Sequence, residues 1–417
     1  MTKINSIKAR QVFDSRGNPT IESEVYLDDG NFASAIIPSG ASTGSYEAFE
    51  LRDIQDQKYL GKGMSQAVEK VNGEISKALN GILIDDQKKI DNILIELDGT
   101  KQKKRLGANA ILSVSIASNK AAAISKKIPL YQNISNGKTL PLPLMNVING
   151  GSHSNNSLRI QEFMIRPDKA KNFKEAINIC FLVIQKLKSL IIKKKFSTNL
   201  GDEGGFAPSL SNNEEAIEFI LEAINMAGFE PGKDVSICLD VAANELYSDK
   251  KYSVNSTKLI SSDKTIKYYL DLIKKYPIKS IEDPFFEDDW ELWTNLTKLS
   301  NNSLQIVGDD LFVTNKERLL KGVGIKAANA ILIKPNQIGT LTETLEVITL
   351  AHQNNYKTIV SHRSGDSEDT FISDLAVATN STQIKTGSLA RSERVAKYNR
   401  LLKIEEELGN SSKMTKV

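Results

Sequence analysis

Three acidic residues close short apolar runs in the second half of the sequence. Asp240 ends VSICLD, Glu282 lies in IKSIED and Asp309 lies in LQIVGDD. Carboxylate oxygens on a rigid frame suit a hard divalent cation that keeps some water and takes further oxygens from a substrate. These residues therefore predict a magnesium site, unless they are structural carboxylates paired with lysine or arginine.

Neither the histidines nor the cysteines have the spacing of a zinc site. The three histidines, His153, His352 and His362, form no HExxH or HxH pattern, and we expect His352 to lie at the surface. Cys180 and Cys238 stand in apolar contexts without CxxC spacing. We expect both to be inert residues of the core.

A lysine and a glutamate stand where general acid–base chemistry would place them. Lys334 ends the apolar run AANAILIK. Burial beside a cation would lower its pKa and let the amine take a proton, whereas the alternative is a lysine that extends to the rim or pairs with an acid. Asp202 and Glu203 lie between glycines in GDEGG, a turn that would expose their carboxyl groups to a pocket and permit a general-acid role. Ordinary turn chemistry explains the same residues equally well.

Cationic residues predict an anionic substrate. Arg363 and Ser364 are adjacent in SHRSG and offer a guanidinium fork and a hydroxyl, a pair that suits phosphate or carboxylate. Lys385, at the end of TQIK, adds a second fixed cation. The sequence has no GxxxxGK[ST] motif and no strand-GxGxxG-helix unit, which argues against a nucleotide-driven or nicotinamide enzyme.

The acidic and cationic residues from Asp240 to Lys385 occupy the same position in a repeated sequence pattern. Each stands at the end of a short β-branched run that precedes an amphipathic helix. From Glu282 onward the runs recur about every 25 residues, the length of one unit in a (β/α) barrel of about 250 residues. The C-terminal ends of barrel strands build the active site, so the pattern predicts one polar mouth. Taken singly, each residue is explained equally well as the solvated end of a strand. The runs are VSICLD, IKSIED, LQIVGDD, NAILIK, YKTIVSHRS and TQIK.

The first part of the chain has a different organisation. Two β-like runs, IESEVYL and NFASAIIP, precede a helix of small apolar residues, GANAILSVSIASNKAAAISKK, which we expect to be buried. YQNISNGKTLPLP is interpreted as a linker because of its prolines. This places one domain at 1–135 and another at 141–417. The loop PSGASTGS (38–45) is either a mobile lid or a plain connection.

The composition is that of an ordinary globular protein. The 417 residues are 40% hydrophobic and 25% charged, and the net charge of +3 does not indicate a nucleic-acid-binding surface. No run approaches the roughly 18 apolar residues of a membrane-spanning helix. The first residues, MTKINSIKARQVFDSRG, lack the apolar stretch of a signal peptide, which predicts a cytoplasmic protein.

The motifs, taken together and in order, resemble the enolase family. The similarity runs from about Lys3 to Leu408 and leaves little of the chain uncovered. The motifs are DSRGNPT, PSGASTG, NGGSH, QEFM, GDEGG, SIEDPF, GDDL, KPNQIG, SHRSG and QIKTGS.

The resemblance implies an α/β fold, namely an enolase-type modified TIM (β/α)8 barrel preceded by an α+β N-terminal capping domain that carries the Ser42 lid loop. It implies a glycolytic lyase that reversibly dehydrates 2-phosphoglycerate to phosphoenolpyruvate through an aci-carboxylate stabilised by Mg²⁺. The family binds two Mg²⁺ per subunit, the second with substrate. By resemblance, Asp240, Glu282 and Asp309 would hold the first ion, and Ser42 would join the second.

The resemblance also implies roles for the remaining residues. Lys334 would be the base that removes the proton next to the carboxylate, and Glu203, assisted by Glu162, would be the acid that protonates the departing hydroxide. His153 would take part in catalysis. Arg363 and Ser364 would bind the phosphate and Lys385 the carboxylate side, with the other substrate contacts made by Gln161, His153, Glu162, Lys334 and His362.

Two alternatives remain open from the sequence. Another lyase of the enolase superfamily would act on a muconate or sugar acid, although those enzymes commonly carry a KxK pair where this chain has STNLGDEGG. A non-catalytic binding or structural protein would keep the fold and lose a ligand or the base, and none is lost. The resemblance further implies a homodimer or an octamer, and a surface or secreted pool beside the cytoplasmic one.

Overall fold

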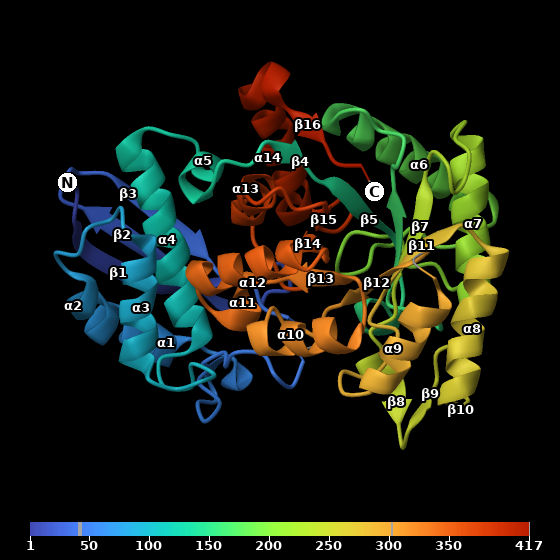
Figure 1. Cartoon of the computed structure of the whole chain (residues 1–417), viewed down its shortest axis with the longest axis horizontal. Helices are drawn as coiled ribbons and strands as arrows, with labels where there is room; N and C mark the ends of the chain where they lie inside the picture. The colour runs from blue at the N-terminus through green and yellow to red at the C-terminus, as the bar shows by residue number, and fades with distance from the viewer. Residues whose placement is uncertain (41–43, 302, 417) are drawn as a thin grey trace.

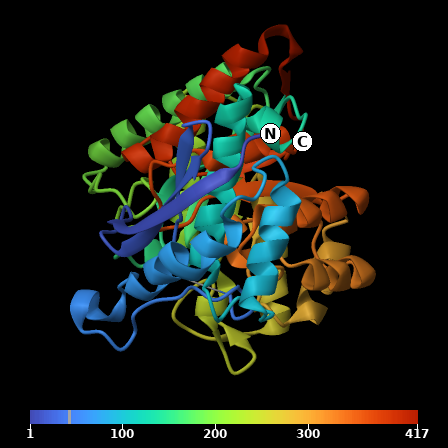
Figure 2. The same cartoon turned by 90° about the vertical axis from the view of Figure 1, so that its left-hand side faces the viewer.

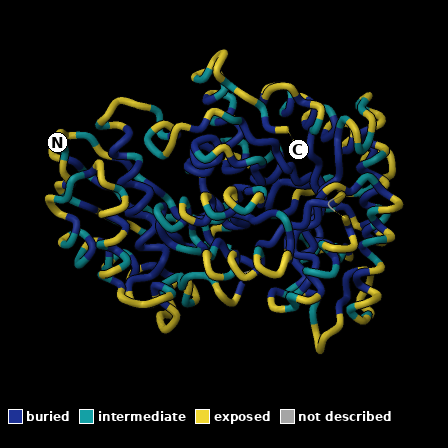
Figure 3. Tube along the Cα trace, viewed as in Figure 1, coloured by how far each residue is buried: buried dark blue, intermediate teal, exposed yellow. Residues whose placement is uncertain are grey.

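The computed structural model describes residues 1–40, 44–301 and 303–416. A closed barrel forms the centre and right of the molecule in Figure 1, and an antiparallel sheet with its helices lies at the left. The buried segments run through both parts and meet between them (Figure 3).

The antiparallel sheet has the order β1-β2-β3, formed by Ile4–Phe13, Pro19–Leu27 and Phe32–Ile36. Along β2, alternate residues from Ile21 to Leu27 are fully buried, which gives the sheet one face for packing. Short helices surround it: α1 (Ser65–Lys70), α2 (Ser76–Leu79), α3 (Gln87–Asp98) and α5 (Leu130–Ile134). Figure 2 brings these blue strands to the front.

The helix α4 (Ala108–Lys126) joins this sheet to the barrel. It packs on β2 and β3 and also contacts the barrel helices α11 (Pro335–Ile338) and α12 (Leu341–Gln353). Its alanines and serines are buried on nearly all sides, so neighbouring backbones approach closely. The predicted buried helix is confirmed.

The barrel is closed in the order β11-β12-β13-β14-β15-β5-β6-β7. Its strands are β5 (Leu142–Asn149), β6 (Glu162–Arg166), β7 (Ser236–Asp240), β11 (Ile278–Glu282), β12 (Gln305–Gly308), β13 (Ala330–Ile333), β14 (Lys357–Ser361) and β15 (Gln383–Lys385). All six runs predicted as strands are strands. The barrel departs from plain alternation because β6 runs antiparallel to both β5 and β7.

Amphipathic helices surround the barrel: α6 (Phe173–Lys193), α7 (Asn213–Met226), α8 (Ser262–Lys275), α9 (Trp290–Leu299), α10 (Lys316–Ile325), α12, α13 (Phe371–Ala378) and α14 (Ser392–Leu408). In α6 the apolar side chains at Ile179, Val183 and Leu187 face the core at helical spacing. Within the described residues, no helix is both long enough and apolar enough to cross a membrane.

Two small sheets complete the described chain. A hairpin extension after β7 contains β8 (Tyr247–Ser248), β9 (Lys251–Tyr252) and β10 (Ile260–Ser261), and β4 (Thr139–Leu140) pairs with β16 (Lys413–Met414). Inside the barrel, small and apolar side chains such as Leu144, Cys238 and Leu332 fill one layer. Cys180 and Cys238 are buried free thiols, as predicted.

The interpretation of YQNISNGKTLPLP as a linker is only partly right. This segment includes the end of α5, the strand β4 and the start of β5, and Pro143 lies inside the buried strand. Leu142 donates its N–H to Thr382 on the β15 side, so the nitrogen of Pro143 points to the other side. There the β6 partners begin only at Met145, and a residue without an N–H is tolerated.

Candidate active site

A polar pocket lies at the C-terminal mouth of the barrel. Most of the predicted site residues line it: His153, Gln161, Glu162, Glu203, Asp240, Asp309, Lys334, His362, Arg363, Ser364 and Lys385. Glu282 is buried beside the pocket, where its carboxylate contacts Lys385. Ser42 lies outside the described residues, as does part of the predicted lid loop. The strand ends therefore form one polar mouth.

The barrel assigns these residues to successive strands around the ring. Asp240, Glu282 and Asp309 end or follow the adjacent strands β7, β11 and β12. Lys334 follows β13, and Glu162 begins β6, which is four steps away in the closed ring of eight. The lysine and the glutamate therefore face one another across the mouth, whereas the three acids lie side by side.

Lys385 is the central cation of the acid cluster. Its Nζ lies 2.8 Å from Asp240 Oδ2, 2.8 Å from Glu282 Oε1 and 3.0 Å from Glu162 Oε1. Burial lowers the pKa of Lys385, but the surrounding carboxylates outweigh burial and raise it well above 10.5. Lys385 is therefore a permanently charged group on the floor of the pocket.

Lys334 contacts Asp309 on the neighbouring strand. Its Nζ donates to Asp309 Oδ2, and Gln337 Nε2 donates to Asp309 Oδ1 at 2.9 Å. Burial lowers the pKa of Lys334, but the Asp309 carboxylate outweighs burial and raises it. The sequence argument predicted a lowered pKa. The direction is opposite here because the group nearest to the ammonium is a carboxylate.

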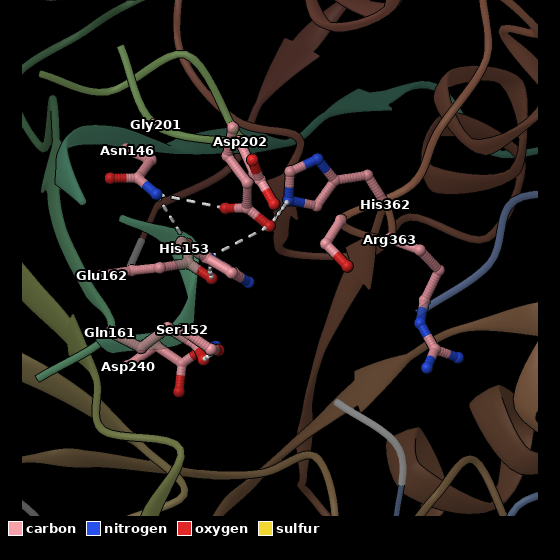
Figure 4. A network of polar contacts seen from close by, with 12 residues as sticks. Asn146, Ser152, His153, Gln161, Glu162, Gly201, Asp202, Asp240, His362 and Arg363 are labelled. Atoms are coloured by element: carbon pink, nitrogen blue, oxygen red, sulfur yellow. Dashed lines mark hydrogen bonds and ion pairs between the residues drawn. The ribbon is translucent and has the colours of Figure 1, made fainter. Parts of the chain in front are cut away.

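Two glutamates and two histidines form a second cluster at the opposite wall (Figure 4). Glu203 Oε1 lies 3.2 Å from His362 Nε2 and 3.8 Å from His153 Nδ1, and Glu162 Oε1 lies 3.9 Å from the same His153 atom. Burial and the neighbouring Glu203 carboxylate raise the pKa of Glu162 well above 4.5. Glu162 is therefore a weaker acid than an ordinary glutamate side chain.

Glu203 lines the pocket, as the turn predicted, although the residue is only 2% exposed. The loop that carries it folds inward beside the end of β5, where Phe206 bridges to Ile148. Gly204 has a φ of +81° and approaches Ala390 O so closely that a Cβ would lie 2.8 Å from it. The glycines thus serve close packing, and the carboxylate they position still lines the pocket.

A buried arginine orients His362. Arg394 NH1 lies 2.6 Å from His362 Nδ1, and a guanidinium can only donate, so this ring nitrogen accepts. The proton of the neutral ring is therefore on Nε2, which faces Glu203. Burial lowers the pKa of His362 to about 4, so the ring is neutral at pH 7.

The segment that carries Arg363 and Ser364 is fixed from several sides. Arg394 donates to the carbonyls of Arg363 and Ser364 at 2.7 and 2.6 Å, and Ser39 pairs with Gly365 through two backbone hydrogen bonds. The Arg363 guanidinium makes two bonds to Glu47, at 3.0 and 3.1 Å. The N-terminal part of the chain therefore contributes directly to the side of the mouth that carries Arg363.

The donor set fits a hard divalent cation. Asp240, Glu282 and Asp309 present carboxylate oxygens on adjacent strands, and the buried Glu282 Oε2 has no hydrogen-bond partner among the described residues. Carboxylate oxygens of Asp283, Asp309 and Asp310 also lie within 4.8 Å of one another. Asp283, however, accepts the backbone N–H groups of residues 309 and 310 at 2.9 Å, which positions those two acids.

Some residues of the site gave no signal in the sequence. Asn146 lies inside the buried strand β5 with no motif of acid–base chemistry around it, although it contacts both glutamates. Glu47 lies far from the barrel motifs in sequence, Arg394 follows the last of them without belonging to it, and both reach the site only through the fold. Asp283 and Asp310 belong to the predicted strand ends IKSIED and LQIVGDD, but nothing in the sequence indicated that Asp283 positions the two acids after β12.

The barrel and its mouth define a class of protein: a TIM-barrel enzyme that binds an anionic substrate and a divalent cation at the strand ends. Residues 4–134 match the family model "Enolase, N-terminal domain", and residues 137–416 match "Enolase, C-terminal TIM barrel domain". The chain is similar to an enolase of Pelagibacter ubique (strain HTCC1062), with 65% identity over 419 residues that cover 100% of both chains.

The chain therefore belongs to the enolase family. Members of this family are Mg²⁺-dependent lyases that dehydrate 2-phosphoglycerate to phosphoenolpyruvate in glycolysis, and this activity is the one that the chain carries. The full-length identity decides against the other superfamily lyases that the sequence left open.

Proposed function

We propose that Lys334 is the base of the dehydration and that Glu203, assisted by Glu162, is the acid. The observation that carries this proposal is the opposition of Lys334 and Glu162 across the mouth of the barrel. A substrate held between them would lose a proton to one wall and its hydroxide to the other. General acid and base groups need such separate positions, each within reach of its own proton.

The other residues bind and orient the substrate in this proposal. Arg363 and Ser364 bind the phosphate, and Lys385 binds the carboxylate side. His153, His362 and Gln161 close the pocket around the reacting carbon and its hydroxyl. Fixed cations at both ends of the substrate hold it in one orientation and exclude water from the site it occupies.

Two Mg²⁺ ions are proposed for each subunit. Asp240, Glu282 and Asp309 would hold the first, and Ser42 would hold the second together with substrate oxygens. When bound, Mg²⁺ stabilises the negative charge that builds on the substrate carboxylate as the neighbouring proton leaves. The residues of this chain would then carry out the two proton transfers.

We further propose domains at 1–135 and 141–417, a cytoplasmic location and a homodimer, with the octamer as the alternative assembly. An exposed apolar patch supports self-association: Ile54, Tyr59 and Leu60 are 72%, 51% and 86% exposed, and Phe13 contacts Tyr59 edge-on at 6.0 Å. Light scattering of the eluting protein tests the assembly, and a monomer at micromolar concentration would contradict it.

Two substitutions test the acid and base roles. Dehydration is followed by the rise in ultraviolet absorbance as phosphoenolpyruvate forms, with Mg²⁺ and again with excess EDTA. Proton removal is followed separately by the exchange of the C2 proton of 2-phosphoglycerate with deuterated solvent. Lys334→Ala is expected to lose both reactions by about 10²–10⁴-fold, and Glu203→Gln to lose dehydration while exchange continues.

Lys103→Ala provides a matched control, because Lys103 is a buried lysine paired with Glu343 outside the pocket. Its turnover should stay near that of the unmodified protein. Near-normal exchange in Lys334→Ala would contradict the base assignment, and parallel loss of both reactions in Glu203→Gln would contradict separate acid and base roles.

A further inference from the structure

Asn146 joins the two glutamates of the acid cluster. It lies on β5, is fully buried, and donates from Nδ2 to Glu162 Oε2 and to Glu203 Oε2, at 3.1 Å each. In Figure 4 two dashed lines lead from the Asn146 amide and mark these hydrogen bonds. Its Oδ1 has no hydrogen-bond partner in the described part of the chain. Both donors of the amide are therefore committed to this pair.

The orientation of the amide follows from the charges around it. A rotation by 180° would bring Oδ1, an acceptor, against carboxylate oxygens that are also acceptors. The arrangement with Nδ2 toward Glu162 and Glu203 is therefore the stable one. Among the described residues, Asn146 is the only donor that the Oε2 atoms of Glu162 and Glu203 share.

The contacts divide the carboxylate oxygens into two sets. The two Oε2 atoms are held by Asn146, whereas the two Oε1 atoms converge on His153 Nδ1, at 3.9 Å from Glu162 and 3.8 Å from Glu203. Glu203 Oε1 also lies 3.2 Å from His362 Nε2. Holding one oxygen of each carboxylate leaves Glu203 Oε1 directed to the two histidines, and Glu162 Oε1 directed to Lys385 Nζ at 3.0 Å and to His153.

We propose that Asn146 is a positioning residue of the dehydration: its amide holds Glu162 and Glu203 so that one oxygen of each faces the reacting hydroxyl. This inference rests on the proposed role of the two glutamates. Asn146 does not line the pocket, in the part of the chain that the structure describes, so it acts through the glutamates and not on the substrate. Two close carboxylates repel, and without the shared donor each would turn toward another partner.

The prediction is a selective loss. Asn146→Leu keeps the volume and removes both donors. A misplacement of about 1 Å lowers a rate by about 10²-fold, so kcat for dehydration should fall by roughly 10- to 100-fold. The KM for 2-phosphoglycerate and the C2 proton exchange should each change by less than about threefold, because neither the anion-binding residues nor Lys334 contacts the amide. Asn146→Asp, which is isosteric and donates at most once, should lose dehydration in the same selective way and serves if Asn146→Leu does not fold.

Gln305→Met is the matched control. Gln305 is also a buried amide in the barrel, where it bonds Gln383 and Ser280 four residues before Asp309. That separation is roughly 13 Å along a strand. The control should lose stability without a change in the ratio of dehydration to exchange, as measured alongside thermal unfolding of each variant.

The outcomes separate this inference from the proposed function. Unchanged dehydration in both Asn146 variants would overturn the positioning role, and so would an equal fall of dehydration and exchange, or the same selective loss in Gln305→Met. Retained dehydration in Glu203→Gln would instead overturn the acid assignment. Loss in Glu203→Gln with none in Asn146→Leu would leave the acid role intact and remove only the inference made here.

Discussion

His362 makes the stability of the folded protein depend on pH in a defined direction. The unfolded chain binds a proton at this ring with the ordinary pKa of 6.5, whereas burial lowers the pKa in the folded protein to about 4. Between these values the unfolded state holds more protons, so the free energy of unfolding falls as the pH falls. The loss begins near pH 6.5 and levels off near pH 4. At about 1.4 kcal/mol for each pH unit, it reaches about 3 kcal/mol.

The perturbation that isolates this contribution is His362→Gln. Glutamine does not titrate, and its amide keeps a donor that can face Glu203. Urea unfolding of both proteins is measured from pH 7.5 to pH 4 in EDTA, and only the difference between the two curves is used, because other carboxylates titrate over the same range. The free energy of the unmodified protein should fall by about 3 kcal/mol more than that of the variant.

An independent measurement is available because the chain has only three histidines. The Cε1–H resonance of His362, assigned by its loss in the variant, should not move between pH 7 and pH 5 in the folded protein. Parallel unfolding curves, or a resonance that titrates near pH 6.5, would refute the conclusion that this ring is held neutral by burial.

Two further predictions concern buried charge and buried thiols. Lys385→Met should lower the free energy of unfolding, measured in EDTA, by about 3–5 kcal/mol. The substitution leaves the carboxylates of Asp240 and Glu282 without their shared cation. A shift of the urea midpoint equivalent to less than about 1 kcal/mol would contradict this prediction. Burial raises the pKa of the Cys238 thiol to about 12 and also raises the pKa of Cys180. Neither thiol should therefore react with a disulfide reagent within minutes in the native protein, whereas both should react in urea. Rapid labelling of either cysteine in the native protein would show that it is accessible and would contradict this prediction.

The barrel was predictable because its strands carry a repeated signal. Each run from VSICLD to TQIK ends in a polar residue, and parallel strands in a barrel bring such ends to one rim. The linker interpretation of YQNISNGKTLPLP was only partly right for a physical reason: its prolines exclude regular helix, but Pro143 is compatible with a strand because its missing N–H does not face a neighbour at the start of β5. Whether a proline fits a strand depends on where the neighbouring strands pair with it. For β5 one of these strands is β15, which lies more than 200 residues further along the sequence.

The polar mouth was predictable in its residue types but not in its electrostatics. The pKa of Lys334 is raised because Asp309 lies against it. His362 is held neutral by burial, and Arg394 on the last long helix fixes which ring nitrogen carries the proton. The sequence gives no signal for Asn146, since an asparagine inside an apolar strand has no spacing pattern to identify it. A role that depends on a single contact between segments far apart in the sequence can be identified only from the three-dimensional structure.

The distribution of charge around the ring explains how so many ionisable groups remain buried. Three acids share Lys385, Asp309 contacts Lys334, and Asn146 serves the pair of glutamates, so that every cluster has a donor from another strand. A buried charge is tolerated only when it is paired and hydrogen-bonded, and removal of one member leaves the others uncompensated. Lys385 at the end of β15 thus compensates acids on β6, β7 and β11, strands that are not its neighbours in the ring. The closed barrel thus fixes the positions of the groups and also makes their burial affordable, which a loop carrying the same residues would not do.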